Sequence, residues 1–292
     1  MPPYMPERPG ATEPLSVFTD DGVTLSGEKS GAGPPIVLLH GLTATRRYVV
    51  MGSRLLERSG LQVVAYDARG HGQSTPAPEP AAYGYERLAR DLLAVLDQVG
   101  LDRAILAGAS MGAQTIVRFA LEHSERVAAL GLITPAFDPA THASEPDAFA
   151  GWDALARGLR EGGVEGFLAA YDFASVPDAW RDTVETVVRQ RLSAHEHPEA
   201  VADALEVVPR SRPFEDMTEL ARIEAPAIVV ASRDEADPTH PLAVGERYAA
   251  AILGAKLLVE EQAPPGQPAR SPIAWQGGQL SRVLLELAGP PD

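Results

Sequence analysis

The segment RAILAGASMGAQT (103–115) decides the fold. It begins with a short apolar run, which is typical of a strand buried on both faces, and it ends where apolar residues adopt helical spacing. Between the two stands Gly108-Ala109-Ser110-Met111-Gly112, a Gly-x-Ser-x-Gly sequence. At a strand-to-helix junction, small neighbours let the backbone turn sharply and hold the serine hydroxyl out above the sheet. The segment therefore predicts a nucleophilic Ser110 beyond the carboxyl end of a buried strand.

The same alternation of strand and helix extends to both sides of this turn. Buried-strand runs occur at 35–40, 61–67, 127–135, 225–232 and 255–261. Helical patterns separate most of them, including one over 44–59, and such alternation predicts a parallel sheet with helices on both faces. Upstream, residues 15–31 alternate around Asp21-Gly22, a pair that favours a tight hairpin, so we expect two antiparallel strands there.

The alternation pauses between residues 139 and 215, where helical patterns follow one another without a clear strand. An insertion of this kind predicts a helical cap over the sheet. We therefore expect an α/β core made of 15–138 and 216–290, a helical cap over 139–215 and a loose, proline-rich segment over 1–14.

Composition and charge restrict the class of protein. The 292 residues include no Cys, which excludes disulfides, thiolate zinc sites and a cysteine nucleophile. With 40 acidic and 25 basic residues the net charge is −15, and such a field repels nucleic acids and anionic membranes. We find no membrane-spanning run and no signal-peptide pattern. We expect a cytoplasmic protein whose partner is a small-molecule acyl substrate or ligand; its oligomeric state is left open.

Four motifs resemble the α/β-hydrolase superfamily, and the similarity extends over about 15–290. They are HGL (40–42), DARGHGQS (67–74), GASMG (108–112) and RDEADPTHP (233–241). The resemblance implies a mostly parallel α/β-hydrolase sheet with an N-terminal antiparallel hairpin and an inserted helical cap. It implies serine chemistry that needs no metal and no other cofactor.

The resemblance also assigns roles to individual residues. It implies Ser110 as the nucleophile, with the backbone amides of Leu42 and Met111 forming an oxyanion hole. The triad acid would be Asp237, in the Asp-Pro-x-x-Pro sequence after the penultimate strand. Asp234, nearby on the same loop, and Asp138, after the preceding strand, are the alternatives.

The sequence departs from the superfamily at the general base. Superfamily hydrolases carry the triad His after the last strand, but here no His follows His240, and Ala269-Arg270 stands where Gly-His is expected. A guanidinium does not deprotonate in proteins and cannot act as a base. His240, on the acid loop, is the first candidate to replace the missing base, and His195 and His197 in the cap are the second. His40 and His71 are expected to brace loops with hydrogen bonds.

Two hypotheses follow from these residues. The first is a serine-dependent hydrolase of a small ester, lactone or related acyl compound, with a non-standard or missing general base. The alternative is a non-hydrolytic member of the fold, either a ligand-binding or regulatory protein or a lyase or isomerase that uses the oxyanion hole. Arg270 with Arg46 or Arg47 could form an anion clamp for a carboxylate; surface arginines paired with the abundant acids are the other interpretation.

Overall fold

The computed structural model describes residues 11–142 and 147–289. Its eight strands are β1 (Glu13–Phe18), β2 (Thr24–Ser30), β3 (Pro35–Leu39), β4 (Gln62–Tyr66), β5 (Ala104–Ala109), β6 (Val127–Ile133), β7 (Ala227–Ala231) and β8 (Lys256–Val259). They form one sheet in the order β1-β2-β4-β3-β5-β6-β7-β8. β1 pairs antiparallel with β2, and β2 pairs antiparallel with β4, whereas every later pair is parallel. The predicted fold class is confirmed.

The N-terminal hairpin turns where Asp21-Gly22 predicts it. The Thr19 amide donates to the Val23 carbonyl at 3.0 Å, and the Gly22 amide donates back to the Thr19 carbonyl at 3.2 Å. Gly22 has a φ of 85°, which glycine adopts without the steric cost that a side chain would add. The turn therefore places β1 beside β2, and β2 in turn pairs with β4 at the edge of the parallel part of the sheet.

Helices cover both faces of the sheet. The core helices are α1 (Leu55–Arg58), α2 (Tyr85–Val99), α3 (Met111–Glu122), α7 (Leu242–Ala251) and α8 (Gly277–Leu285). Val37 and Leu39 of β3 lie in the core cluster that includes α2, α3 and α7, whereas Ile36 and Leu38 lie in the cluster that includes α1 and α8. This two-residue period explains why the strands are apolar throughout, because each face needs its own buried side chains.

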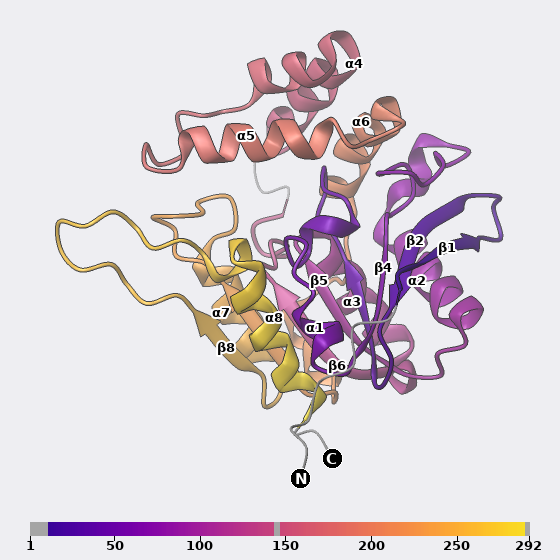
Figure 1. Cartoon of the computed structure of the whole chain (residues 1–292). Coiled ribbons are helices and arrows are strands. Elements are labelled where there is room, and N and C mark those ends of the chain that lie inside the picture. Colours follow the sequence, from indigo (N-terminus) through magenta and orange to yellow (C-terminus); the bar gives the residue numbers. More distant parts are fainter. Residues whose placement is uncertain (1–10, 143–146, 290–292) are drawn as a thin grey trace.

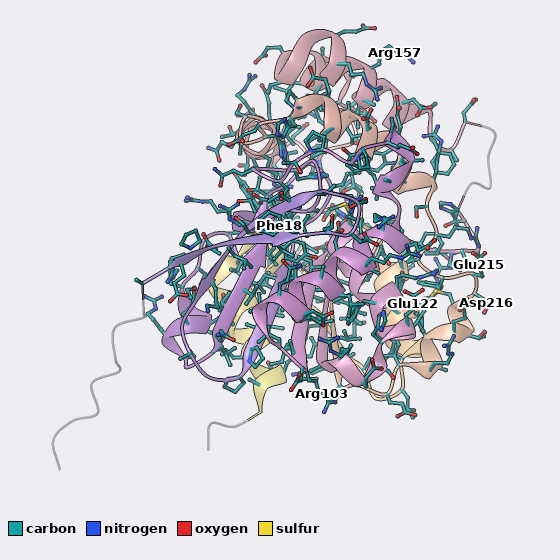
Figure 2. The ribbon with its side chains drawn as sticks, turned by 90° about the vertical axis from the view of Figure 1, so that its right-hand side faces the viewer. Phe18, Arg103, Glu122, Arg157, Glu215 and Asp216 are labelled. Atoms are coloured by element: carbon teal, nitrogen blue, oxygen red, sulfur yellow. The ribbon has the colours of Figure 1, made fainter. Side chains whose placement is uncertain are left out.

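Three further helices form a layer over one end of the sheet (Figure 1). They are α4 (Ala150–Ala170), α5 (Arg181–Leu192) and α6 (Pro198–Val207), and all lie in the range where the sequence predicts a cap. In Figure 2, Arg157 of α4 lies at the top and Arg103, just before β5, at the bottom, so the helices lie beyond the carboxyl ends of the strands. That 139–215 is a separate domain stays a prediction.

The helix predicted over 44–59 is wrong. The structure has only η1 (Arg46–Tyr48) and the single turn α1 in this range. Thr43, Met51 and Gly52 have φ values of 66°, 49° and 72°, which are incompatible with a right-handed helix.

The other 3₁₀ turns are η2 (Pro80–Tyr83), η3 (Ser124–Arg126), η4 (Val208–Arg210), η5 (Met217–Arg222), η6 (Ile273–Trp275) and η7 (Glu286–Ala288). Among the residues described, no helix combines the length and the apolar character needed to cross a membrane.

Candidate active site

Ser110 lies on a sharp turn between β5 and α3, with a φ of 50° and a ψ of −110°. A positive φ is strained for a residue with a side chain. The flanking glycines allow it: a Cβ at Gly108 would lie 2.4 Å from the carbonyl carbon of Gly112, and a Cβ at Gly112 would lie 2.3 Å from the carbonyl oxygen of Leu39. The Gly-x-Ser-x-Gly spacing therefore lets α3 begin directly against β5 and β3, with Ser110 at the bend.

An imidazole from another loop contacts the Ser110 hydroxyl. His240 Nε2 lies 3.1 Å from Ser110 Oγ, and His240 Nδ1 lies 2.9 Å from Asp237 Oδ2. Because the carboxylate only accepts, His240 Nδ1–H donates to Asp237, which leaves Nε2 as the acceptor for the serine O–H. Serine, imidazole and carboxylate thus form one continuous hydrogen-bonded chain, although the last two come from the same short loop between β7 and α7.

A four-residue turn brings Asp237 and His240 together. The His240 amide donates to the Asp237 carbonyl at 3.3 Å, and Pro238 occupies the second position of the turn, where its restricted φ is favourable. Thr239, which the sequence analysis did not single out, donates its hydroxyl to Asp237 Oδ1 at 2.7 Å. The signal that could have found this arrangement is Asp-Pro-Thr-His itself, since such a turn places its first and fourth side chains close together.

The environment of Asp237 favours the ionised carboxylate. Burial raises its pKa, but the charge of His240 and hydrogen bonds from His240 and Thr239 act more strongly together, so the pKa of Asp237 is lowered. The two alternative acids are engaged elsewhere. Asp234 accepts from the Leu242 amide at 2.8 Å at the start of α7, and Asp138 pairs with Arg247.

The loop that carries Leu42 is oriented by His40. Burial lowers the pKa of His40 to about 3, so its ring is neutral. Its Nε2 accepts from the Ala68 amide at 2.8 Å, which leaves Nδ1–H to donate to the Gly41 carbonyl at 2.8 Å. In a trans peptide the N–H is opposite the C=O, so the Leu42 amide points away from His40.

The Leu42 and Met111 amides have no acceptor within 11–142 and 147–289. Met111 is the first residue of α3, where amides lack an intrahelical partner and the helix dipole favours negative charge. Two free donors next to a serine hydroxyl are the arrangement that stabilises an oxyanion. The structure thus brings together Ser110, Asp237 and His240, with both predicted amides on the adjoining loop and helix.

The cap histidines do not contact Ser110. His195, between α5 and α6, accepts from the Gly72 amide at 2.8 Å through Nδ1 and donates to the Thr43 carbonyl at 3.0 Å through Nε2. Burial lowers the pKa of His195, which favours this neutral form. His197 lies at the N-cap of α6. His71 is buried and donates to the Arg69 carbonyl at 3.0 Å, so it braces its loop as expected.

Arg46 and Arg270 pair with carboxylates of the protein rather than forming an anion clamp. Arg46 pairs with the buried Asp67 and donates to Gln73 at 2.9 Å. Arg270 is half-exposed and pairs with Glu261 at 3.2 Å on the long loop between β8 and α8. Each guanidinium thus has a carboxylate partner of its own, as the interpretation of surface arginines paired with the abundant acids expects.

A cavity of about 260 Å³ opens beside Ser110. Its lining combines residues of the core with residues from the beginning of the cap: Leu42, Met111, Phe137, His142, Phe149 and Trp152. A cavity of this volume and lining suits a small, partly apolar ligand rather than a polymer. Of the aromatic residues in the predicted cap, Phe149 and Trp152 line the cavity, whereas Phe167 packs among α4, α5 and α6.

Comparison with known proteins agrees with the fold. A family model described as alpha/beta hydrolase fold matches residues 34–170. A thermophilic esterase from Thermogutta terrifontis, solved with malate bound, matches with a TM-score of 0.75 at 25% identity, over 94% of this chain and 98% of that one. The chain belongs to the α/β-hydrolase superfamily.

Curated relatives of this α/β-hydrolase are less complete matches. A putative non-heme haloperoxidase of Mycobacterium phage D29 is 38% identical over 122 residues, which is 41% of this chain and 43% of that protein. A putative carbamate hydrolase of Variovorax paradoxus is 28% identical over 205 residues, 70% of this chain and 75% of that protein. The chain spans less than half the length of several curated relatives, the phage protein among them.

Proposed function

We propose that this α/β-hydrolase cleaves small carboxylic esters or lactones by a serine mechanism in which His240 is the general base. The observation that carries the proposal is the 3.1 Å contact between His240 Nε2 and Ser110 Oγ. A serine hydroxyl is a weak nucleophile until a base accepts its proton, and an imidazole at hydrogen-bond distance is such a base. The esterase likeness and the cavity size support a small acyl substrate.

In the first half-reaction, Ser110 Oγ attacks the carbonyl carbon while its proton passes to His240 Nε2. Asp237 stabilises the imidazolium that forms. The carbonyl oxygen becomes an oxyanion and accepts hydrogen bonds from the Leu42 and Met111 amides, each worth roughly 3–4 kcal/mol by analogy with a measured oxyanion donor. The tetrahedral intermediate then collapses, and the leaving alkoxide takes the proton from Nε2.

In the second half-reaction, water replaces the alcohol. His240 accepts a proton from the water, the hydroxide attacks the Ser110 ester, and the carboxylic acid leaves as Ser110 regains its proton. A lactone follows the same course, except that its alcohol stays attached to the acyl chain. The non-hydrolytic alternative rests on the lack of a base at position 270, and the contact of His240 with Ser110 argues against it.

Hydrolysis of short p-nitrophenyl esters and of a simple lactone by wild type and Ser110→Ala tests the proposal. We expect at least a ~10³-fold loss of kcat/KM in Ser110→Ala, because no other side chain takes over acylation. Ser59→Ala, at an exposed serine before β4, is the matched control. Stoichiometric labelling of wild type by a fluorophosphonate, and none of Ser110→Ala, gives a second readout. Equal rates for Ser110→Ala and wild type would remove Ser110 from the chemistry.

A further inference from the structure

Arg191 brings a positive charge from the cap to the loop that forms the candidate oxyanion hole. It lies in the last turn of α5, and its guanidinium lies over the ring of Tyr48, 5.1 Å from the ring centroid. Tyr48 belongs to η1, which directly follows the loop of Leu42. The side chain of Arg191 is therefore held between the cap and the region of the core that carries the site.

Within 11–142 and 147–289, Arg191 makes no ion pair and no side-chain hydrogen bond, and its Nε is buried without a partner. Arg189, two residues earlier on the same helix, pairs with Glu165 and Glu185 on the solvent side. Residues two apart on a helix point in nearly opposite directions, which separates the paired arginine from the unpaired one. In a chain with 40 acidic and 25 basic residues, an arginine without an acidic partner requires an explanation.

Among the described residues, the carboxylate that acts on the pKa of Arg191 is that of Asp237. Burial lowers the pKa of Arg191, and the groups that oppose this are Tyr48, Tyr171 and Asp237. Asp237 is already engaged by His240 and Thr239. A guanidinium remains protonated even when partly buried, so Arg191 is a cation without an anionic partner among the described residues. It is close enough to the triad acid, Asp237, for the two charges to interact.

We propose that Arg191 binds a carboxylate of the substrate, so that the preferred substrates are esters or lactones that carry a free carboxylate. This inference rests on the proposed function and narrows its substrate class. A planar guanidinium matches a carboxylate with two parallel hydrogen bonds, which gives both affinity and orientation. The carboxylate would then be held at the α5 side of the site while the reacting carbonyl lies at Ser110.

A purely structural role for Arg191 makes a different prediction. If Arg191 only attaches α5 to the core by stacking on Tyr48, replacing Arg191 would lower kcat/KM for every substrate alike. It would also lower the free energy of unfolding by the contribution of one cation–π contact. If Arg191 binds the substrate, its removal affects charged substrates selectively. The discriminating quantity is therefore the ratio of kcat/KM for two substrates that differ only in one negative charge.

Two matched pairs test this, one for each side of the scissile bond. The acyl-side pair is 4-nitrophenyl hydrogen glutarate and 4-nitrophenyl methyl glutarate, and the alcohol-side pair is 3-acetoxybenzoate and its methyl ester. For wild type we expect at least one pair to favour the carboxylate by about 10-fold or more. Arg191→Gln should reduce that ratio by about 10- to 100-fold and leave the neutral ester within about 3-fold. Arg191→Lys should lie between the two, because it keeps the charge without the planar geometry.

Arg189→Gln is the control, because it removes the same charge from the same helix and should leave the ratio unchanged. A wild-type ratio near one in both pairs overturns the inference, as does an Arg191→Gln variant that loses charged and neutral substrates equally; the proposed function survives both results. If instead Ser110→Ala matches wild type on every ester, the proposed function fails. Carboxylate binding is then judged by calorimetric titration with glutarate, and the inference is overturned if wild type and Arg191→Gln bind equally.

Discussion

Replacing His240 by glutamine separates a base on the acid loop from a base at the position that superfamily hydrolases use. Glutamine keeps a side-chain amide that can still donate to Asp237, so the local structure is retained. It cannot take a proton from Ser110. The experiment compares three variants with wild type: His240→Gln, Arg270→His and the double variant.

The expected loss follows from what the imidazole alone contributes. His240 makes both contacts of the chain, at 2.9 Å to Asp237 and 3.1 Å to Ser110. In subtilisin, removing the triad His alone costs about 10⁶ in kcat, or about 8 kcal/mol in the activation free energy. The oxyanion amides stay in place and retain about 10³- to 10⁴-fold over water. For His240→Gln we therefore expect kcat to fall by about 10⁴ to 10⁶.

Arg270 is half-exposed and pairs with Glu261, so an imidazole at position 270 should not reach Ser110. We expect Arg270→His to retain the wild-type rate and the double variant to stay as low as His240→Gln. Steady-state hydrolysis of p-nitrophenyl butyrate and fluorophosphonate labelling measure both effects. His240 is not the base if His240→Gln remains within 10-fold of wild type, or if Arg270→His restores the activity of His240→Gln.

Further predictions concern the scaffold of the site. Gly112→Ala should cost about 3 kcal/mol by urea unfolding, because its Cβ would meet the Leu39 carbonyl oxygen at 2.3 Å, whereas Gly278→Ala, in open space on α8, should gain up to about 1 kcal/mol. Arg69→Gln should destabilise by about 3–5 kcal/mol, because it leaves the buried Asp91 without its 2.6 Å partner. Stability should decrease as the pH is lowered: burial holds the pKa of His40 at about 3 in the folded chain, against an ordinary 6.5, so the unfolded chain binds an extra proton once the pH drops below 6.5. Between about pH 7.5 and 5 this amounts to about 2 kcal/mol for His40 alone. His40→Asn should flatten that slope in urea titrations at several pH values, and an unchanged slope would contradict the assignment.

The parallel sheet could be predicted because its strands are buried on both faces. A run such as PIVLL, which forms β3, has no polar face, and this distinguishes it from the alternating residues of β1 and β2. The same physics explains the two glycines around Ser110, since each allows backbone to approach within distances that a Cβ would prevent. These features depend on local sequence and on burial, and both can be inferred from the order of residues.

What could not be predicted depends on backbone angles and on partners distant in the chain. The pattern over 44–59 is helical by spacing, but Thr43 and Met51 adopt positive φ, which a right-handed helix does not allow. The pairing of Arg46 with Asp67, which engages one arginine of the predicted clamp, joins two loops that follow different strands. Likewise, spacing gives no sign that Arg191 lacks an acidic partner. These pairings depend on how several helices, strands and loops pack against one another, which the order of residues alone does not show.

The position of His240 could be predicted in part, because the turn at Asp237 fixes one of its two contacts through local sequence. When acid and base come from loops after different strands, their separation depends on how both loops are held. Here a single turn with Pro238 at its second position sets the distance between Asp237 and His240 through local backbone geometry. Only the approach of this loop to Ser110 then depends on the sheet, through β7 and β5. In the proposed mechanism the loop between β8 and α8 needs no catalytic residue, which is consistent with an exposed Arg270 at the position where superfamily members place histidine.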